Sequence, residues 1–332
     1  MVSQTSEVHF QVHRQGNQAT VSLPNRLSIL EAVAFKTTCH QLIDDDPTPQ
    51  EIRLDFGQTT FIDSSGIGAL ISIVKTTKAQ EITLILQQVN SQVMAVFSLT
   101  SLDQVLTIEQ PIHETVLIGA EPINKQLPMT HPSVKSWIKR VIDIVGSLVG
   151  LAITSVLFIP VAIAIKLDSP GPIFFGQIRC GWMGKNFRMW KFRSMVPDAE
   201  SRQHEVENEA DGGVFKNSKD PRVTRVGRFL RRTSLDELPQ FWNVLTGEMS
   251  LVGTRPPTAD EVERYEVPQW QRLDVKPGMT GEWQVNGRSE VKSFEDIIRL
   301  DLKYQENWSL MYDIKLIIKT VLILFRKNSG AM

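Results

Sequence analysis

The feature that most constrains this chain is an uncharged run of 22 residues, 144–165, which Pro160 interrupts. As a straight helix the run would be about 33 Å long, which is enough to cross a bilayer. Proline has no N–H to donate, so Pro160 is expected to break the helix about two-thirds of the way along. Trp137, Lys139 and Arg140 precede the run and are predicted to be interfacial anchors. The sequence therefore predicts a membrane-associated helix with a break at Pro160.

Two membrane topologies are compatible with this run. The 20 residues before it carry four basic side chains and the 20 after it carry three, so the charge bias gives no strong orientation. A helix that enters the bilayer, bends at Pro160 and returns would keep both flanks on the cytoplasmic face. We favour this re-entrant helix, and a spanning helix is the alternative.

The charge balance and the cysteines exclude several classes of protein. The chain of 332 residues has 36 basic and 37 acidic side chains, which argues against a nucleic-acid binder that relies on excess positive charge. Cys39 and Cys180 lie far apart in the sequence, which favours reduced thiols in a cytoplasmic setting. The first residues are polar, so no secretory signal is expected, and the six histidines show no metal-ligand spacing.

Residues 1–110 are predicted to form a small α/β domain, because apolar periodicities of strands and helices alternate along them. The first two strands are expected to form a hairpin, with turn residues between them at 15–17. The expected order is strand 8–12, strand 19–23, helix 29–43, strand 51–56, helix 67–77, strand 82–86 and helix 93–97.

The turn before the helix at 67–77 reads Asp63-Ser64-Ser65-Gly66-Ile67-Gly68. With this turn in this order of elements, the domain resembles the STAS family of anti-sigma-factor antagonists and sulphate-transporter tails. In the antagonists a partner kinase phosphorylates the serine after the aspartate, so the resemblance implies a protein partner and a candidate phosphorylation site at Ser64. A phosphate would add roughly −1.5 to −2 charges at a helix N-terminus. The alternative is that Asp63 and Ser64 only cap the helix.

Residues 111–133 are predicted to be an extended linker, because four prolines lie among polar residues there. Residues 134–332 then form the second predicted domain. Near its end, the apolar segment 308–325 carries Lys315 and Lys319 four positions apart. We expect an interfacial helix there, with a buried core helix as the alternative.

The second domain contains two adjacent carboxylates, Asp236 and Glu237, in the segment 233–240. Pro239 fits the first turn of a helix, which would place Asp236 at or beside the helix N-terminus, where free N–H groups favour anions. Asp236 is therefore a candidate nucleophile for phosphoryl transfer. The alternatives are that Asp236 merely caps the helix or that Ser234 and Glu237 form a capping box. Asp198 and Glu200 form a competing acidic pair, which we rank second.

Taken in order, the motifs of about 200 residues resemble the bacterial sugar transferase family of small monotopic phosphoglycosyl transferases. The motifs that carry the resemblance follow the apolar run: Ser169-Pro170-Gly171-Pro172, Lys191-Phe192-Arg193-Ser194-Met195, Asp198-Ala199-Glu200, Thr233 to Gln240, Gly253-Thr254-Arg255-Pro256 and Lys276 to Ser289. Three positions depart from the family pattern: Ile159, Thr254 and Glu282. The resemblance implies a monotopic α+β catalytic domain with a re-entrant helix.

The resemblance also implies a two-step reaction at the cytoplasmic face of the bacterial inner membrane. Asp236 would attack a nucleoside-diphosphate sugar, expected to be UDP-linked, and form a phosphosugar aspartyl intermediate. A polyprenyl phosphate would then accept the sugar phosphate and so initiate surface-glycan (exopolysaccharide) assembly. Glu237 and Asp236 would hold Mg²⁺, which suits oxygen ligands and phosphates. Arg255 and Arg288 are candidate substrate contacts, with structural pairing as the alternative.

Two other functions remain open on the sequence. One is a catalytically inactive, membrane-bound regulatory scaffold that acts through the STAS-like domain, although the intact Asp236 and Glu237 count against it. The other is a transporter subunit, but a single hairpin provides too little membrane structure for a transport pathway.

Overall fold

The computed structural model describes residues 10–109, 130–208, 217, 219–286 and 293–325. The chain divides into two compact units. Unit 1 comprises Met1–Thr130, Met183–Lys185 and Tyr265–Asp274, and unit 2 comprises His131–Trp182, Asn186–Arg264 and Val275–Met332. Most of the predicted linker and the N-terminal half of the first predicted strand lie outside the described residues.

Unit 1 contains the predicted α/β domain, built on a sheet of five strands in the order β1-β2-β4-β6-β7. The hairpin of β1 and β2 is antiparallel, and the other neighbours pair in parallel. The strands are β1 (Gln11–Gln15), β2 (Gln18–Ser22), β4 (Glu51–Asp55), β6 (Thr83–Gln87) and β7 (Thr107–Glu109). Val21, Leu54 and Leu86 are fully buried in the core of this unit. The predicted alternation of strands and helices is confirmed.

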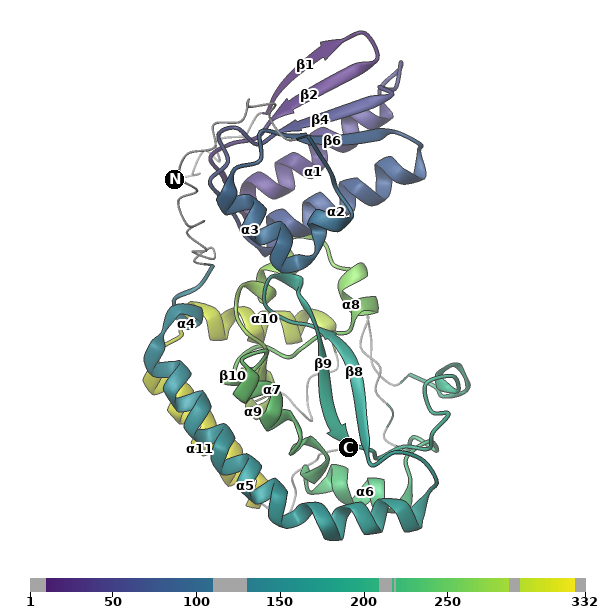
Figure 1. Cartoon of the computed structure of the whole chain (residues 1–332), viewed down its shortest axis with the longest axis vertical. Coiled ribbons are helices and arrows are strands. Elements are labelled where there is room, and N and C mark those ends of the chain that lie inside the picture. The colour runs from purple at the N-terminus through teal and green to yellow at the C-terminus, as the bar shows by residue number, and fades with distance from the viewer. Residues whose placement is uncertain (1–9, 110–129, 209–216, 218, 287–292, 326–332) are drawn as a thin grey trace, which may run out of the picture. The chain divides into compact units, whose positions relative to one another are not determined.

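The helices of unit 1 follow the expected positions. They are α1 (Ile29–Asp44), α2 (Ser64–Ala79) and α3 (Ser91–Thr100), and α1 and α2 pack against each other beside the sheet (Figure 1). A short parallel pair, β3 (Arg26–Leu27) with β5 (Phe61–Ile62), joins the entrances to α1 and α2. Strands of two or three residues are too short for a readable periodicity, so the sequence predicted neither this pair nor β7.

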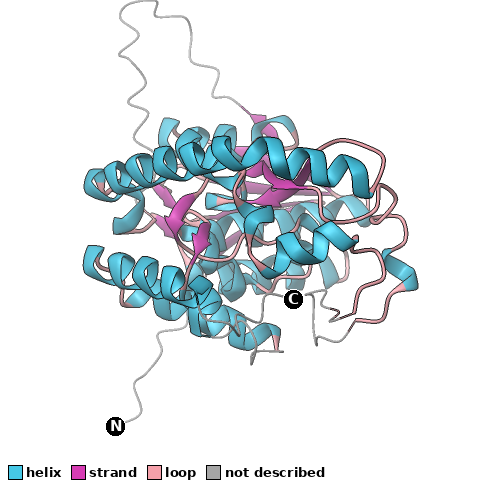
Figure 2. Cartoon of the chain, turned by 90° about the horizontal axis from the view of Figure 1, so that it is seen from below, coloured by secondary structure: helices cyan, strands magenta, loops and turns pink. Residues whose placement is uncertain are grey.

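Unit 2 is mostly helical, and the strands of the described chain are short (Figure 2). Its strands form two pairs: antiparallel β8 (Phe174–Cys180) with β9 (Asn186–Phe192), and parallel β10 (Ser250–Val252) with β11 (Gly278–Thr280). Its helices are α4 (Pro132–Lys135), α5 (Trp137–Asp168), α6 (Arg225–Arg232), α7 (Gln240–Thr246), α8 (Ala259–Glu263), α9 (Glu282–Asn286), α10 (Phe294–Glu306) and α11 (Leu310–Phe325). Helix α4 begins inside the range predicted as linker.

Helix α5 contains the apolar run and continues through Pro160 for 32 residues. The predicted break is therefore a bend in a continuous helix, and Figure 1 shows α5 changing direction toward its C-terminal end. Such bends are typical of an internal proline, whose ring displaces one helical hydrogen bond. Within the described residues, α5 is long and apolar enough to cross a membrane by length and composition.

One side of α5 packs on the other elements of unit 2 along much of its length. Gly150 lies against the ring of Phe241 on α7, and a side chain at this position would collide with that ring. Farther along, Val161 and Ile165 share a buried cluster with Phe192 and Leu230. The absence of a side chain at Gly150 therefore lets α7 approach the helix closely.

The other side of α5 exposes a row of large apolar side chains. Helix α11 continues this pattern, although Asp313 and Leu316 on α11 are buried. Its interfacial location stays a prediction. The exposed residues on α5 include Val145, Leu148, Val149, Ile153, Val156, Ile159 and Ile163, and those on α11 include Met311, Ile318, Val321, Leu322 and Leu324. Soluble monomers rarely expose contiguous apolar surface on this scale, so this face is suited to a bilayer.

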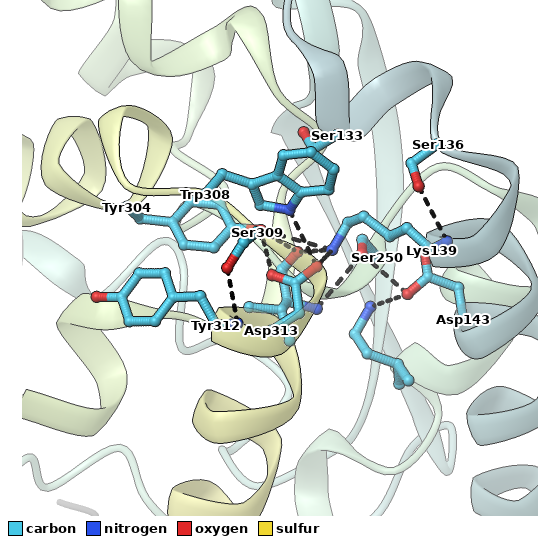
Figure 3. A network of polar contacts seen from close by, with 12 residues as sticks. Ser133, Ser136, Lys139, Asp143, Ser250, Tyr304, Trp308, Ser309, Tyr312 and Asp313 are labelled. Carbon is cyan, nitrogen blue, oxygen red and sulfur yellow. Dashed lines mark hydrogen bonds and ion pairs between the residues drawn. The ribbon is translucent and has the colours of Figure 1, made fainter.

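The beginning of α5 is fixed by a buried polar network (Figure 3). The Lys139 ammonium donates to the Asp313 carboxylate at 2.6 Å and to the Val252 carbonyl at 2.9 Å. Tyr304 and Trp308 also donate to Asp313, at 2.8 and 3.1 Å. The prediction of Lys139 as an interfacial anchor is wrong, because its partners on α10, α11 and β10 draw it into the interior.

Arg140 is not an anchor either, because its guanidinium donates to the Val244 and Leu245 carbonyls at 2.7 and 2.6 Å, near the end of α7. Of the three predicted anchors, only Trp137 is largely exposed, at 73%. At the other end of α5, Arg193 donates to the Ser169 and Pro170 carbonyls at 2.7 and 2.6 Å. Both ends of α5 are thus tied to the rest of unit 2 by basic side chains.

We expect Asp313→Ala to lower the free energy of unfolding of unit 2 by about 3–5 kcal/mol, because it leaves the Lys139 charge buried without its carboxylate. Chemical denaturation of the purified chain in detergent measures the change. The matched control is Lys315→Ala, an exposed charge two positions along the same helix, which should change stability by less than about 0.5 kcal/mol. Equal effects of the two substitutions would contradict the role assigned to the network.

Candidate active site around Asp236 and Glu237

Asp236 and Glu237 lie in a single 3₁₀ turn, Leu235–Glu237, between α6 and α7. Helix α7 begins at Gln240 with Pro239 as its N-cap residue, so Asp236 lies in the turn before the helix rather than in its first turn. Ser234 has a left-handed backbone, with φ 55°, and its side chain makes no capping hydrogen bond. The capping box proposed as an alternative for Ser234 and Glu237 is therefore not formed.

The Asp236 side chain is buried, and it interacts electrostatically with the half-buried guanidinium of Arg231 on α6. Asp236 is 6% exposed. Burial lowers the pKa of Arg231, and the charge of Asp236 is the strongest opposing influence that favours its charged form. Arg231 also donates through Nε to the Ser194 hydroxyl at 3.0 Å. A buried carboxylate thus lies within the electrostatic influence of a positive charge.

Glu237 has a basic partner on the neighbouring hairpin. Lys191 on β9 donates to its carboxylate at 3.0 Å. On β8, burial and the positive charge of Arg255 together lower the pKa of Arg179 to about 10, although Glu261, Cys180 and Glu237 act in the opposite direction. The carboxylate pair thus lies among basic groups, and such groups suit the recognition of phosphate.

Arg255 is held by two hydrogen bonds to Glu261 of α8, at 2.7 and 3.0 Å. Glu261 also belongs to the capping box of Thr258 at the start of α8. The structural pairing considered for Arg255 is therefore present, and its contact with substrate stays a prediction. Arg288, the second predicted contact, lies outside the described residues.

Two polar side chains fix the elements that carry the site. Asn243 of α7 donates to the Arg188 carbonyl at 2.8 Å and accepts from the Trp190 N–H at 3.1 Å, which aligns α7 with β9. Asp168, at the end of α5, accepts from the Val226 N–H at 2.8 Å and so holds the start of α6. The positions of Lys191 and Arg231 relative to the carboxylates depend on these two contacts.

The donor set around Asp236 and Glu237 fits a magnesium ion that substrate phosphates share. Mg²⁺ in such sites uses one or two carboxylates together with phosphate oxygens and water. Among the described residues, no cluster of three or more acidic, histidine or cysteine side chains is suited to hold a metal by itself. Mg²⁺ at Asp236 and Glu237 therefore stays a prediction.

The competing pair, Asp198 and Glu200, lies in an exposed turn. Asp198 is 3.8 Å from Arg202, an ordinary surface ion pair. Solvent screens such pairs, and nothing in their surroundings isolates an anion from water.

Sequence reasoning did not assign Lys191 and Arg179 to the site. Both lie on strands of the β8–β9 hairpin, Arg179 on β8 and Lys191 on β9. The signal that was available is a lysine within the strand segment 186–192, where Phe187, Met189 and Phe192 are buried. Arg231 is one of four arginines between residues 225 and 232, and only the folded chain distinguishes it from Arg225, Arg228 and Arg232.

Two sequence families match this chain. Residues 134–327 match the Bacterial sugar transferase family, and residues 9–116 match the STAS domain. The first match covers more than half of the chain, so the protein belongs to the bacterial sugar transferase family, with a STAS-like domain at its N-terminal side.

Several curated relatives are similar to the transferase region. The galactosyl transferase CpsE of Streptococcus agalactiae is 49% identical over 55% of this chain and 41% of its own length. The UDP-glucose:undecaprenyl-phosphate glucose-1-phosphate transferase of Escherichia coli is 44% identical over 64% of this chain and 42% of its own length. The exopolysaccharide production protein ExoY of Rhizobium meliloti is 38% identical over 55% of this chain and 83% of its own length. The chain spans less than half the length of the first two.

Among solved structures, the phosphorylated form of the Bacillus cell fate determinant SpoIIAA matches 31% of this chain and 93% of its own, with 18% identity and a TM-score of 0.27. The STAS assignment rests on the family match and on the order of strands and helices in unit 1.

Proposed function

We propose that this protein transfers a sugar 1-phosphate from a UDP-linked sugar to a polyprenyl phosphate and so initiates surface-glycan assembly. The observation that carries the proposal is a turn in which Asp236 is buried within electrostatic reach of Arg231, and in which Glu237 is paired with Lys191 of β9. Relatives named as undecaprenyl-phosphate sugar phosphate transferases support the reaction class. An inactive scaffold is not favoured, because it would have no use for a carboxylate pair set among basic side chains.

The proposed reaction has two displacements at one phosphorus atom. A carboxylate oxygen of Asp236 attacks the sugar-linked phosphorus, a P–O bond forms, and the bond to the nucleoside monophosphate breaks as that anion leaves. An oxygen of the polyprenyl phosphate then attacks the same phosphorus and displaces the Asp236 carboxylate. Splitting the exchange into two steps is the advantage of a covalent nucleophile.

The chain's own residues have separate roles in these steps. Arg231 supplies positive charge near Asp236, whose carboxylate is the nucleophile. Lys191 orients Glu237, and Arg179 adds positive charge where phosphate oxygens accumulate. A bound Mg²⁺ would offset repulsion between the carboxylates and the phosphates.

The apolar face of α5 and α11 supports a location at the cytoplasmic face of the inner membrane. Helix α5 contacts the rest of unit 2 along its length: through Lys139 near its start, Gly150 in its middle and Ile165 near its end. A helix that crossed the bilayer would carry these contacts through the hydrocarbon region, together with the polar turn around Asp236. A bent, re-entrant helix avoids this cost. The STAS-like domain is proposed to bind a protein partner or a kinase that acts at Ser64.

We expect purified wild-type protein, incubated with a labelled UDP-sugar and Mg²⁺ but no lipid acceptor, to acquire a covalent phosphosugar. Asp236→Asn should abolish the label, because an amide oxygen is a poor nucleophile. Mass spectrometry of the intact chain and of its peptides locates the adduct. The matched control is Asp198→Asn in the competing acidic pair, which should label as wild type does. Full labelling of Asp236→Asn, together with loss of label in the control, would show that Asp236 is not the nucleophile.

A re-entrant helix should keep the chain before and after α5 on one side of the membrane. We expect cysteines introduced at exposed Lys78 and exposed Lys219 to resist a membrane-impermeant thiol reagent in intact cells and to react in inverted vesicles. Wild type, whose Cys39 and Cys180 are buried, is the control. Labelling of Lys78→Cys and Lys219→Cys from opposite sides would show that α5 spans the bilayer.

A further inference from the structure

A short segment of the transferase sequence, Tyr265–Asp274, belongs structurally to unit 1. Its 3₁₀ portion, Val267–Asp274, packs on α1 and α2 of the STAS-like domain. Trp270 is buried, and a Cβ atom at Gly68 would lie 2.5 Å from its ring, so the ring rests directly on the backbone of α2. Unit 1 thus includes a peptide from within the transferase region of the sequence.

The contact is centred on Ser64, which is 0% exposed. The Ser64 N–H donates to Oδ1 of Asp274 at 3.1 Å. The Ser64 hydroxyl oxygen lies 2.7 Å from the same Oδ1 and 2.6 Å from the Trp270 carbonyl oxygen. Both neighbours of the hydroxyl are acceptors in their ordinary states.

The proton count at Ser64 identifies the state of Asp274. A hydroxyl has one proton, so it can donate to the Trp270 carbonyl or to Asp274 but not to both. Both short contacts are satisfied when the Asp274 carboxyl carries a proton of its own and donates to the Ser64 oxygen. The Ser64 cluster is therefore most stable when the Asp274 carboxyl is protonated and carries no charge.

A second buried carboxyl adds to this requirement. Asp63 caps α2 by accepting from the Gly66 N–H at 2.9 Å. Burial raises the pKa of Asp63 to about 6, and burial together with the charge of Asp63 raises the pKa of Asp274 to about 7.

Few cations counter this negative charge among the described residues of the surrounding elements. Arg26 on β3 favours ionised Asp63, and Glu31 on α1 opposes it. Two further cations on the packed elements have other partners: Lys36 of α1 lies 3.2 Å from Glu266, and Arg272 donates to the Tyr265 hydroxyl at 2.7 Å.

We propose that Tyr265–Asp274 is a built-in partner of the STAS-like domain, and that additional negative charge in the Ser64 cluster releases it. A phosphate on Ser64, or ionisation of both carboxyls, would bring like charges together in a buried site, where their repulsion is weakly screened. The segment connects α8, which holds Arg255 through Glu261, directly to β11. Release of the segment would loosen the chain on both sides of it. Because the segment follows α8 in the chain, release would also affect Arg255, the candidate substrate contact.

The pH dependence follows from the direction of the shift. Asp274 holds its proton more tightly in the docked segment than in the free segment. In the free segment an aspartate carboxyl titrates at about 3.9. Docking is therefore strongest below that value, weakens as pH rises to about 7 and changes no further above it.

Hydrogen exchange of the full chain in detergent, measured by mass spectrometry and corrected for intrinsic rates, tests the proposal. We expect residues 265–274 of wild type to exchange at least tenfold faster at pH 8.5 than at pH 5. Asp274→Asn should stay protected at both, because its amide can donate to the Ser64 oxygen without a titrating proton. Equal protection of wild type at the two pH values would overturn the proposal, and so would a pH response that persists in Asp274→Asn.

Charge at Ser64 supplies the second arm of the experiment. Ser64→Asp should expose residues 265–274 at pH 7, whereas the double variant Ser64→Asp with Asp274→Asn should recover protection. The matched control is Ser91→Asp, an exposed serine at the first position of α3, which should leave the segment protected. Protection of β4 and β6 reports whether unit 1 remains folded, and if Ser64→Asp unfolds it, the comparison of wild type with Asp274→Asn decides. Full protection of the segment in Ser64→Asp would contradict the proposal.

Discussion

The structure of unit 2 depends on how one apolar helix is held. Helix α5 offers few polar groups, yet buried polar contacts hold it near both ends: the Lys139–Asp313 pair at its start and the Arg193 guanidinium at its end. Burying such charges is costly unless each finds partners, so these contacts favour one arrangement of the helix over others. Since the opposite face of α5 is apolar and exposed, the same contacts fix which face a membrane would meet.

The candidate active site is built from this helix outward. Gly150 lets α7 approach α5, and Asp168 at the end of α5 holds α6, so the turn between α6 and α7 has little freedom. That turn carries Asp236 and Glu237. The chemistry proposed for the protein thus lies on elements that the membrane helix positions directly, which gives a physical reason for lipid and nucleotide substrates to meet there.

The sequence predicted the elements whose periodicity is long enough to read. The strands and helices of unit 1, the apolar helix and the position of the carboxylate pair belong to this group. Contacts between distant residues were not predictable, as Lys139 shows: its partner Asp313 lies 174 residues away, and a lysine beside an apolar run ordinarily indicates an anchor. Glu282 departs from the family pattern, but Lys303 and Tyr312 donate to its carboxylate at 3.0 and 2.6 Å, which only the folded chain reveals.

Isotope exchange tests the central claim, a covalent phosphosugar on the protein, most directly. Wild-type protein is incubated with unlabelled UDP-sugar, labelled UMP and Mg²⁺, with lipid acceptor absent, and label in the UDP-sugar is measured. Because the first displacement is reversible and needs no acceptor, the account predicts that label enters the UDP-sugar. An enzyme that forms product only after adding lipid acceptor, with no exchange in its absence, would contradict it.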